Sequence, residues 1–285
     1  MKKIVLIIVT IVMIAALGVS FAACDNATPT QKLLSNSRPW TSRDTDEVFV
    51  YNVVYKKGTE DELNGTMTVT VKSFNGAEGD TVTIGEWKKE KAIGYLTTTT
   101  LEMDNGDVKN TQAFFTTNVE VKYASETKTY GGVTSGYTAE YKNEKCYYTV
   151  FEGDDKSSGE IKTGDFSESP FIDNAILYQV ARCIPSSVSS FTFDVPDVTL
   201  GDTQSVTMSA ATGTTTTIKA ADEAETEFKC YFVQIALNRT FPGSGESLTC
   251  MIASDPYETE NGEIKKLVVS ITEGDTTYTL VSAKD

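Results

Sequence analysis

Alternating apolar and polar residues along most of the chain predict a protein built from β-strands. Met67, Val69 and Val71 alternate with threonines, and this period of two is typical of a half-buried strand. Residues 48–55 are rich in β-branched and aromatic side chains, which also favour a strand. Comparable runs recur as far as residue 283, so we expect an all-β fold.

Turn residues between these runs predict hairpins. Asp-Asn-Gly-Asp at 104–107 separates predicted strands at 95–103 and 113–123. Asn143-Glu144 separates predicted strands at 137–141 and 145–151. Residues 153–164 are charged and contain glycine, so we expect them to form a solvated loop.

Residues 172–184 are the one segment that breaks this pattern, and their apolar spacing predicts a helix. Asp173 can cap its start, and Pro185 ends the run. Four apolar residues fall on one face at helical spacing: Ile172, Ile176, Val180 and Cys183.

The first 24 residues resemble a bacterial lipoprotein signal. Two lysines precede an apolar run, and small residues lead to Cys24. The resemblance implies a signal peptide at 1–23 and lipidation of Cys24, with a polar tether at 24–45 and a single all-β domain at 46–285. We therefore expect a lipid-anchored protein on the extracytoplasmic face of the cell membrane. The alternative is an uncleaved transmembrane anchor, for which the apolar run is nearly long enough.

Charge and composition exclude several classes of function. Loss of residues 1–23 takes away two lysines and changes the net charge from −15 to −17, so we expect no nucleic-acid partner. The chain has no histidine, which removes the Ser-His-Asp and Cys-His catalytic constellations and the commonest zinc ligand. No acidic run has calcium-loop spacing. We therefore expect no enzyme activity, no metal and no cofactor.

Four cysteines besides Cys24 lie in apolar stretches: Cys146, Cys183, Cys230 and Cys250. Outside the cytoplasm an even number favours disulfides, whereas buried free cysteines behave as small hydrophobic residues. Both interpretations stay open. If a bridge exists, we expect it between Cys230 and Cys250, because their predicted strands are consecutive.

The helix and the C-terminal strands are similar to a family of bacterial envelope proteins known as domain of unknown function 3108 (DUF3108). The residues that carry this resemblance are Asp173, Leu177-Tyr178, Arg182 and Pro185, then the segments 228–233, 253–256 and 268–280. The resemblance implies a curved, open antiparallel barrel around a helix, lipocalin-like or LolA/LolB-like in outline. It implies no known activity.

An open barrel of this kind can bind an apolar ligand. Arg182 lies on a mostly apolar helix, so it either meets an anionic part of a ligand or pairs internally, with Asp173 or a nearby glutamate. The other candidate groove residues are aromatic or apolar, and each is also a plausible core residue: Trp87, Tyr95, Phe114, Leu177, Tyr178 and Phe232.

The sequence thus favours a non-catalytic binding or carrier domain for an apolar or lipid-like ligand. The first alternative is a structural protein that docks to another envelope component through a sheet edge. The second is a hydrolase that uses two carboxylates, which would have to face each other in one cleft.

Overall fold

The computed structural model describes residues 34, 38–40, 46–187, 190–219, 225–237 and 247–285. The predicted signal peptide, Cys24 and most of the predicted tether lie outside the described residues.

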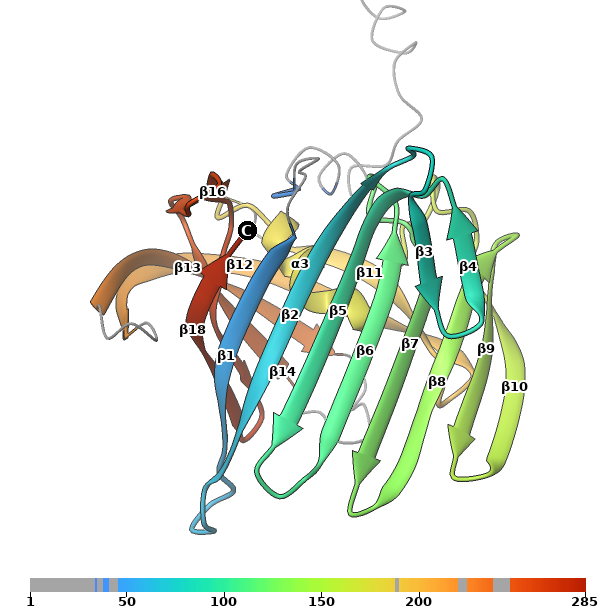
Figure 1. Cartoon of the computed structure of the whole chain (residues 1–285), viewed down its shortest axis with the longest axis horizontal. Coiled ribbons are helices and arrows are strands. Elements are labelled where there is room, and N and C mark those ends of the chain that lie inside the picture. Colours follow the sequence, from blue (N-terminus) through green and yellow to red (C-terminus); the bar gives the residue numbers. More distant parts are fainter. Residues whose placement is uncertain (1–33, 35–37, 41–45, 188–189, 220–224, 238–246) are drawn as a thin grey trace, which may run out of the picture.

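One antiparallel sheet of fourteen strands forms most of the molecule (Figure 1). Its strand order is β10-β9-β8-β7-β6-β5-β2-β1-β18-β17-β14-β13-β12-β11, so the first and last strands of the chain are neighbours. The strands are β1 (Glu47–Tyr55), β2 (Leu63–Asn75), β5 (Ile93–Met103), β6 (Val108–Phe115), β7 (Val121–Tyr130), β8 (Val133–Lys142), β9 (Lys145–Glu152), β10 (Asp155–Lys162), β11 (Phe191–Asp197), β12 (Asp202–Lys219), β13 (Glu225–Leu237), β14 (Ser247–Ala253), β17 (Val268–Glu273) and β18 (Thr276–Lys284).

Two short hairpins lie outside this sheet. One consists of β3 (Thr81–Ile84) and β4 (Trp87–Glu90), and the other of β15 (Tyr257–Glu258) and β16 (Glu263–Ile264).

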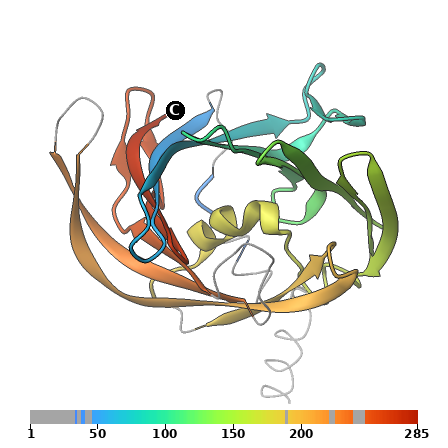
Figure 2. The same cartoon turned by 90° about the horizontal axis from the view of Figure 1, so that it is seen from below.

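The sheet curls into a nearly closed barrel (Figure 2). Its two edge strands, β10 and β11, are not paired with each other. The edges nevertheless come close, because a Cβ atom at Gly201, in the turn between β11 and β12, would lie 2.9 Å from the hydroxyl oxygen of Tyr148 in β9. The all-β barrel expected from the sequence is therefore confirmed.

The helical segment lies inside the barrel, as Figure 2 shows. It begins as the 3-10 helix η1 (Asn174–Ile176) and continues as α3 (Leu177–Cys183). Asp173 caps it by accepting a hydrogen bond of 2.8 Å from the amide of Ala175. The predicted apolar face is fully buried, and the hydroxyl of Tyr231 in β13 donates to the carbonyl of Ile184 at 2.8 Å.

The predicted hairpin turns are confirmed. Residues 104–107 join β5 to β6, and Asn143 and Glu144 join β8 to β9 with φ angles of 52° and 60°. The strand predicted at 113–123 is wrong, because a turn interrupts it between β6 and β7. Val119 in this turn has a φ angle of 67°, a left-handed conformation that the alternation of apolar residues does not reveal.

The solvated loop predicted at 153–164 is also wrong. Most of it forms the edge strand β10, which pairs with β9 along its whole length. Only one neighbour holds this strand, and charged residues are a common way to protect a sheet edge from pairing with other chains. The polar composition therefore reflects the position of the strand in the sheet.

Of the two interpretations left open for the cysteines, the structure shows buried free thiols at all four described positions, and the bridge favoured for the disulfide case, Cys230–Cys250, is absent. Cys230 lies opposite Ala253 and Cys250 lies opposite Val233 in the β13–β14 pairing. An offset of three residues turns the two side chains to opposite faces of the sheet and separates them by about 10 Å along the strands. A disulfide cannot span that separation.

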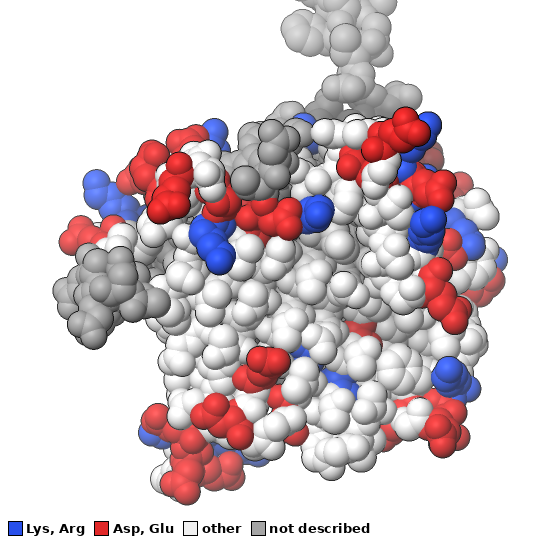
Figure 3. Space-filling view, in the orientation of Figure 1, with Lys and Arg blue, Asp and Glu red and all other residues white. Residues whose placement is uncertain are grey.

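The charged side chains gather near the two ends of the barrel on the face shown in Figure 3, and its middle is mostly uncharged. Threonines of β2 and β5 contribute to this uncharged middle part, since Thr68 pairs with Thr100 and Thr70 pairs with Thr98. The negative charge of the protein is therefore unevenly distributed over this face.

Candidate ligand cavity

A cavity of about 350 Å³ lies between the helix and the inner face of the sheet. It reaches the surface beside Tyr130, whose side chain is 44% exposed. Tyr130 ends β7, Leu101 and Lys109 flank the β5–β6 turn, and Glu273 ends β17. The cavity therefore lies at the end of the barrel where these hairpins turn.

The apolar part of the wall comes from both sheet and helix. Alternating strand residues point inward, so Met67 of β2, Leu101 of β5 and Leu248 of β14 face the same space. Leu177 and Ala175 contribute from the helix, and Pro196 and Val198 from the segment around the end of β11. Such a lining is suited to the hydrocarbon part of a ligand.

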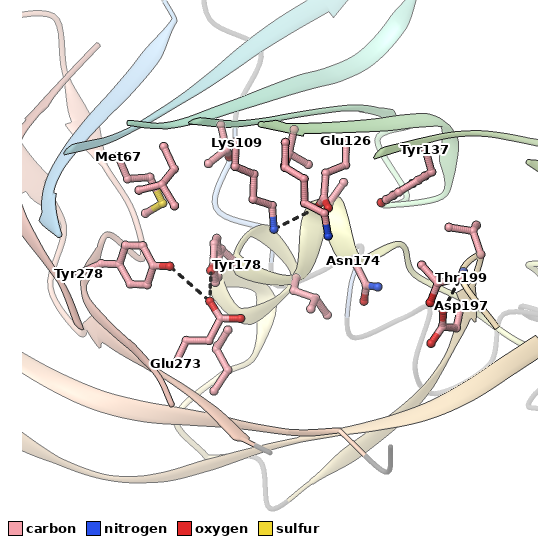
Figure 4. A pocket seen from close by; sticks show the side chains of 18 of the residues that line it. Met67, Lys109, Glu126, Tyr137, Asn174, Tyr178, Asp197, Thr199, Glu273 and Tyr278 are labelled. Carbon is pink, nitrogen blue, oxygen red and sulfur yellow. Dashed lines mark hydrogen bonds and ion pairs between the residues drawn. The ribbon is translucent and has the colours of Figure 1, made fainter. Parts of the chain in front are cut away.

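An ion pair projects into the cavity from β6 and β7 (Figure 4). The ammonium of Lys109 lies 3.0 Å from the carboxylate of Glu126, and the two side chains are 39% and 17% exposed. Burial alone would lower the pKa of Lys109, but attraction to Glu126 and to Glu273 outweighs it and raises the pKa. Lys109 therefore carries a positive charge inside the cavity at neutral pH.

Glu273 lies on the opposite wall, as Figure 4 shows. Its carboxylate accepts hydrogen bonds from the hydroxyls of Tyr178 and Tyr278, each with a distance of 3.4 Å between the oxygen atoms. Burial, and then the nearby carboxylate, raise the pKa of both tyrosines, so both hydroxyls stay protonated and able to donate. The long distances indicate weak hydrogen bonds.

Tyr137 connects the cavity wall to the start of the helix. Its hydroxyl donates to Asp173 at 3.0 Å, and the hydroxyl of Tyr141 donates to the other carboxylate oxygen. Burial raises the pKa of Asp173, although these hydrogen bonds and the one from the amide of Ala175 partly oppose the effect. The network holds the first turn of the helix against β8.

Asn174 contributes a buried amide oxygen that has no hydrogen-bond partner among the described residues. Asn174 lines the cavity, and Figure 4 shows it between the Lys109–Glu126 pair and Asp197. A buried acceptor of this kind is stabilised when a donor reaches it.

Only two of the seven residues predicted for a groove line the cavity, namely Leu177 and Tyr178. Trp87 and Phe114 pack in a separate cluster with Val82 and Ile84 of the β3–β4 hairpin. The ring of Trp87 stacks on that of Tyr123 at 5.0 Å. The groove role expected for Trp87 and Phe114 is therefore wrong, because the hairpin covers this face of the sheet.

Tyr95 and Phe232 do not line the cavity either. Tyr95 packs in the core between Trp40 and Phe115, at ring distances of 5.3 Å and 5.6 Å. Phe232 is only half-buried, and it alternates with the buried residues Tyr231 and Val233. For these two residues the expected groove role is also wrong.

Arg182 lies away from the cavity, in a buried network. It donates to the carboxylate of Glu47 at 2.8 Å, and to the carbonyls of Lys265 and Lys266 at 2.9 Å and 3.1 Å. Its guanidinium also lies 5.1 Å from the centre of the Phe49 ring. The expected internal pair with a glutamate is confirmed, and the expected place in a ligand groove is wrong.

Sequence reasoning missed the charged residues of the cavity, although a signal for them exists. Lys109 is an even number of residues from the buried Ala113 of β6, so the two side chains point to the same face of the sheet. The same holds for Glu126 and the buried Ala124 of β7. A charge at an inward position of a strand is costly unless it is paired or reaches water, so such positions are candidate sites.

Among the residues that the structure describes, no group of three or more carboxylates and cysteines is placed to hold a metal ion. None of the described helices has the length and apolar character needed to cross a membrane.

Comparison with known proteins supports the fold. No protein-family model matches the chain, and no curated protein is similar to it in sequence. The fold is similar to that of a β-barrel-like protein from Brucella abortus, which belongs to domain of unknown function DUF1849 and whose crystal structure is known. The two share 11% sequence identity with a TM-score of 0.51, and the match covers 85% of this chain and 98% of the other. This neighbour belongs to DUF1849, so the resemblance to DUF3108 stays a prediction.

Proposed function

We propose that this protein is a binding domain that holds one small amphipathic molecule inside its barrel. The observation that carries the proposal is the cavity of about 350 Å³, which has an apolar wall and a few convergent polar groups near its opening. Cavities of this size and composition are typical sites for small ligands. The apolar part of the ligand would contact Leu101, Leu177 and Leu248, and its polar part would face the charged side chains of the cavity, Lys128 and Glu273 among them.

The proposal includes lipid anchoring through Cys24. The first described residues support a suitable orientation, because Trp40 lies 5.8 Å from the guanidinium of Arg182, and β1 begins at Glu47 in the same network. The cavity opens at the other end of the barrel. A lipid on Cys24 would hold the protein on the membrane with this opening directed away from it, where it can exchange ligand with the surroundings.

The test is to purify the protein from cells and record its native mass before and after extraction with organic solvent. A chain that begins at Asp25 keeps every described residue and omits the anchor. We expect a discrete bound mass that extraction removes. Thr99→Phe should abolish it, because Thr99 lines the cavity and a phenyl ring would fill the space.

Thr98→Phe is the matched control. Thr98 immediately precedes Thr99 in β5, and its hydroxyl accepts a hydrogen bond of 3.5 Å from the side-chain amide of Gln112 on the outer face. Thr98→Phe makes the same chemical change as Thr99→Phe but outside the cavity, so the bound mass should remain. Absence of any bound mass in the unmodified protein, together with a stable partner in crosslinking, would instead favour docking through an exposed edge such as β10.

Hydrolysis by two carboxylates is a second candidate, because Glu126 and Glu273 line the same cavity. This arrangement meets the first requirement of that mechanism, a shared cleft. Hydrolysis of a glycan panel that is lost in both Glu126→Gln and Glu273→Gln would support it. Turnover that both variants retain would exclude it.

A further inference from the structure

We propose that the ligand of this cavity carries a zwitterionic head group, with its negative charge at Lys128 and its positive charge at Glu273. The inference rests on the proposed function and specifies the chemical class of the ligand. It follows from two opposite charges that line one cavity, each without an ion-pair partner of its own among the described residues.

The first observation is a pair of lysines that face each other across two strands. Lys109 of β6 is directly opposite Lys128 of β7, and both line the cavity. Like charges in this arrangement repel each other. Glu126 forms an ion pair with Lys109 only, and no carboxylate of the described chain lies within ion-pair distance of Lys128. The ammonium of Lys128 lies 6.0 Å from the centre of the Tyr130 ring.

The second observation concerns Glu273. Within the described ranges no lysine or arginine lies within ion-pair distance of this carboxylate, and its hydrogen bonds from Tyr178 and Tyr278 are 3.4 Å long. A carboxylate beside the rings of two tyrosines is a favourable environment for an ammonium group, because the ring faces also attract cations. An ammonium of the ligand would therefore stabilise Glu273.

The remaining charge at the cavity, Asp197, is already satisfied. Its carboxylate accepts hydrogen bonds from the amide and hydroxyl of Thr199 at 2.9 Å and 2.6 Å, from the amide of Leu200, and from Gln204. These contacts hold it at the β11–β12 turn. The two lysines and two glutamates that remain balance each other, which favours a ligand with no net charge.

Ligands of a single charge fit this arrangement less well. An anion at Lys128 would leave Glu273 without a cation, and a cation at Glu273 would leave Lys128 without an anion. Partly buried charges gain most when each has an opposite charge nearby. A zwitterion provides both, and its hydrocarbon chain can lie against Met67, Leu101 and Leu248.

The experiment compares four probes with the same eight-carbon chain by titration calorimetry: octylphosphocholine, octanoate, octylammonium and octanol. The protein is the chain that begins at Asp25. We expect octylphosphocholine to bind at least about tenfold more tightly than each of the others, since a charge-assisted contact is worth about that much. Lys128→Met should weaken octylphosphocholine and octanoate, whereas Glu273→Gln should weaken octylphosphocholine and octylammonium.

Matched controls are Lys89→Met and Glu102→Gln, both exposed and outside the cavity, which should change no affinity. Thermal unfolding of each variant shows whether it is folded. If none of the four probes binds, the proposed function fails. If octanol binds as tightly as octylphosphocholine, or if octanoate or octylammonium binds most tightly, the cavity is a binding site but the zwitterion inference is overturned.

Discussion

Arg182 and Glu47 form a buried ion pair of 2.8 Å, with side chains only 1% and 5% exposed. The pair joins the helix inside the barrel to the first residue of β1, 135 positions earlier in the chain. Gln179 also accepts a hydrogen bond from the guanidinium at 3.1 Å. Because both charges are removed from water, each depends on the other for its stability.

Removal of one partner should therefore destabilise the protein strongly. We expect Glu47→Ala to lower the free energy of unfolding by about 3–5 kcal/mol, because it leaves the guanidinium buried without its counter-ion. Urea unfolding followed by circular dichroism measures the loss.

The control for this prediction is Glu62→Ala. The carboxylate of Glu62 lies 2.8 Å from the ammonium of Lys56, the same distance as in the Arg182–Glu47 pair. The side chains of Glu62 and Lys56 are, however, 50% and 53% exposed. Exposed pairs contribute about 0–1 kcal/mol. Equal losses in the two variants would contradict the idea that burial makes the Arg182 pair important.

The helix could be predicted from sequence, because the information lies within a dozen residues. Capping by Asp173 and burial of Ile176 and Val180 follow from local spacing. The partner of Arg182 could not be predicted, since Glu47 reaches it only through the pairing of distant strands. The same reason explains why the choice between free thiols and a Cys230–Cys250 bridge stayed open, because only the register of β13 against β14 separates these two cysteines.

The cavity could be predicted only in part. Apolar residues on a strand show that a face is covered, but they do not show whether the covering element lies inside or outside the barrel. Phe114 is buried by the external β3–β4 hairpin, whereas Leu177 borders the internal cavity. Only the curled sheet shows that Lys109 and Glu273 line the same cavity.

The four buried cysteines should be unreactive in the folded protein. Burial raises the pKa of Cys183 to about 12 and that of Cys230 to about 11. Burial, together with the nearby Asp173, raises the pKa of Cys146 to about 12. Almost no thiolate, the reactive form, is then present at neutral pH.

A thiol reagent such as 5,5′-dithiobis(2-nitrobenzoic acid), applied to the chain that begins at Asp25, tests this. We expect no labelling of the folded protein within minutes, and four labelled thiols after unfolding in guanidinium without reductant. Fewer than four would indicate a disulfide and contradict the free cysteines of the structure.

Gly94 in β5 should tolerate a side chain poorly, because both its backbone conformation and its neighbouring strand oppose one. Its φ angle is +144°, and a Cβ atom would lie 2.2 Å from the carbonyl oxygen of Phe115 in the neighbouring β6. Gly94→Ala therefore combines backbone strain with a clash against backbone, and we expect a loss of about 2–4 kcal/mol in urea unfolding.

Gly58→Ala is the comparison, because it places a side chain at a positive φ angle in open space. Gly58 has a φ angle of +59°, and no atom lies within 4 Å of the position of its Cβ atom. This variant should lose only the cost of the left-handed conformation, about 1 kcal/mol. Similar losses at the two positions would show that β5 and β6 move apart easily at Gly94.

Asp173 should make the stability of the protein depend on pH in an unusual direction for a carboxyl group. Its pKa is raised above the ordinary value of 3.8, mainly by burial, so the folded state holds a proton that the unfolded state has released. Stability is then greatest below about pH 4 and falls as the pH rises through the higher pKa of the folded state. Above that pKa the folded protein carries a buried charge, and the loss is complete.

Asp173→Asn tests this prediction, because an amide does not titrate and its oxygen still accepts a hydrogen bond from the amide of Ala175. We expect the stability of the unmodified protein, relative to that of the variant, to decrease as the pH rises above about 4, and to level off only once the pH exceeds the raised pKa of Asp173. Urea unfolding of both proteins across this range gives the difference. A difference that grows with pH would mean that the hydroxyls of Tyr137 and Tyr141 stabilise the carboxylate more than burial destabilises it.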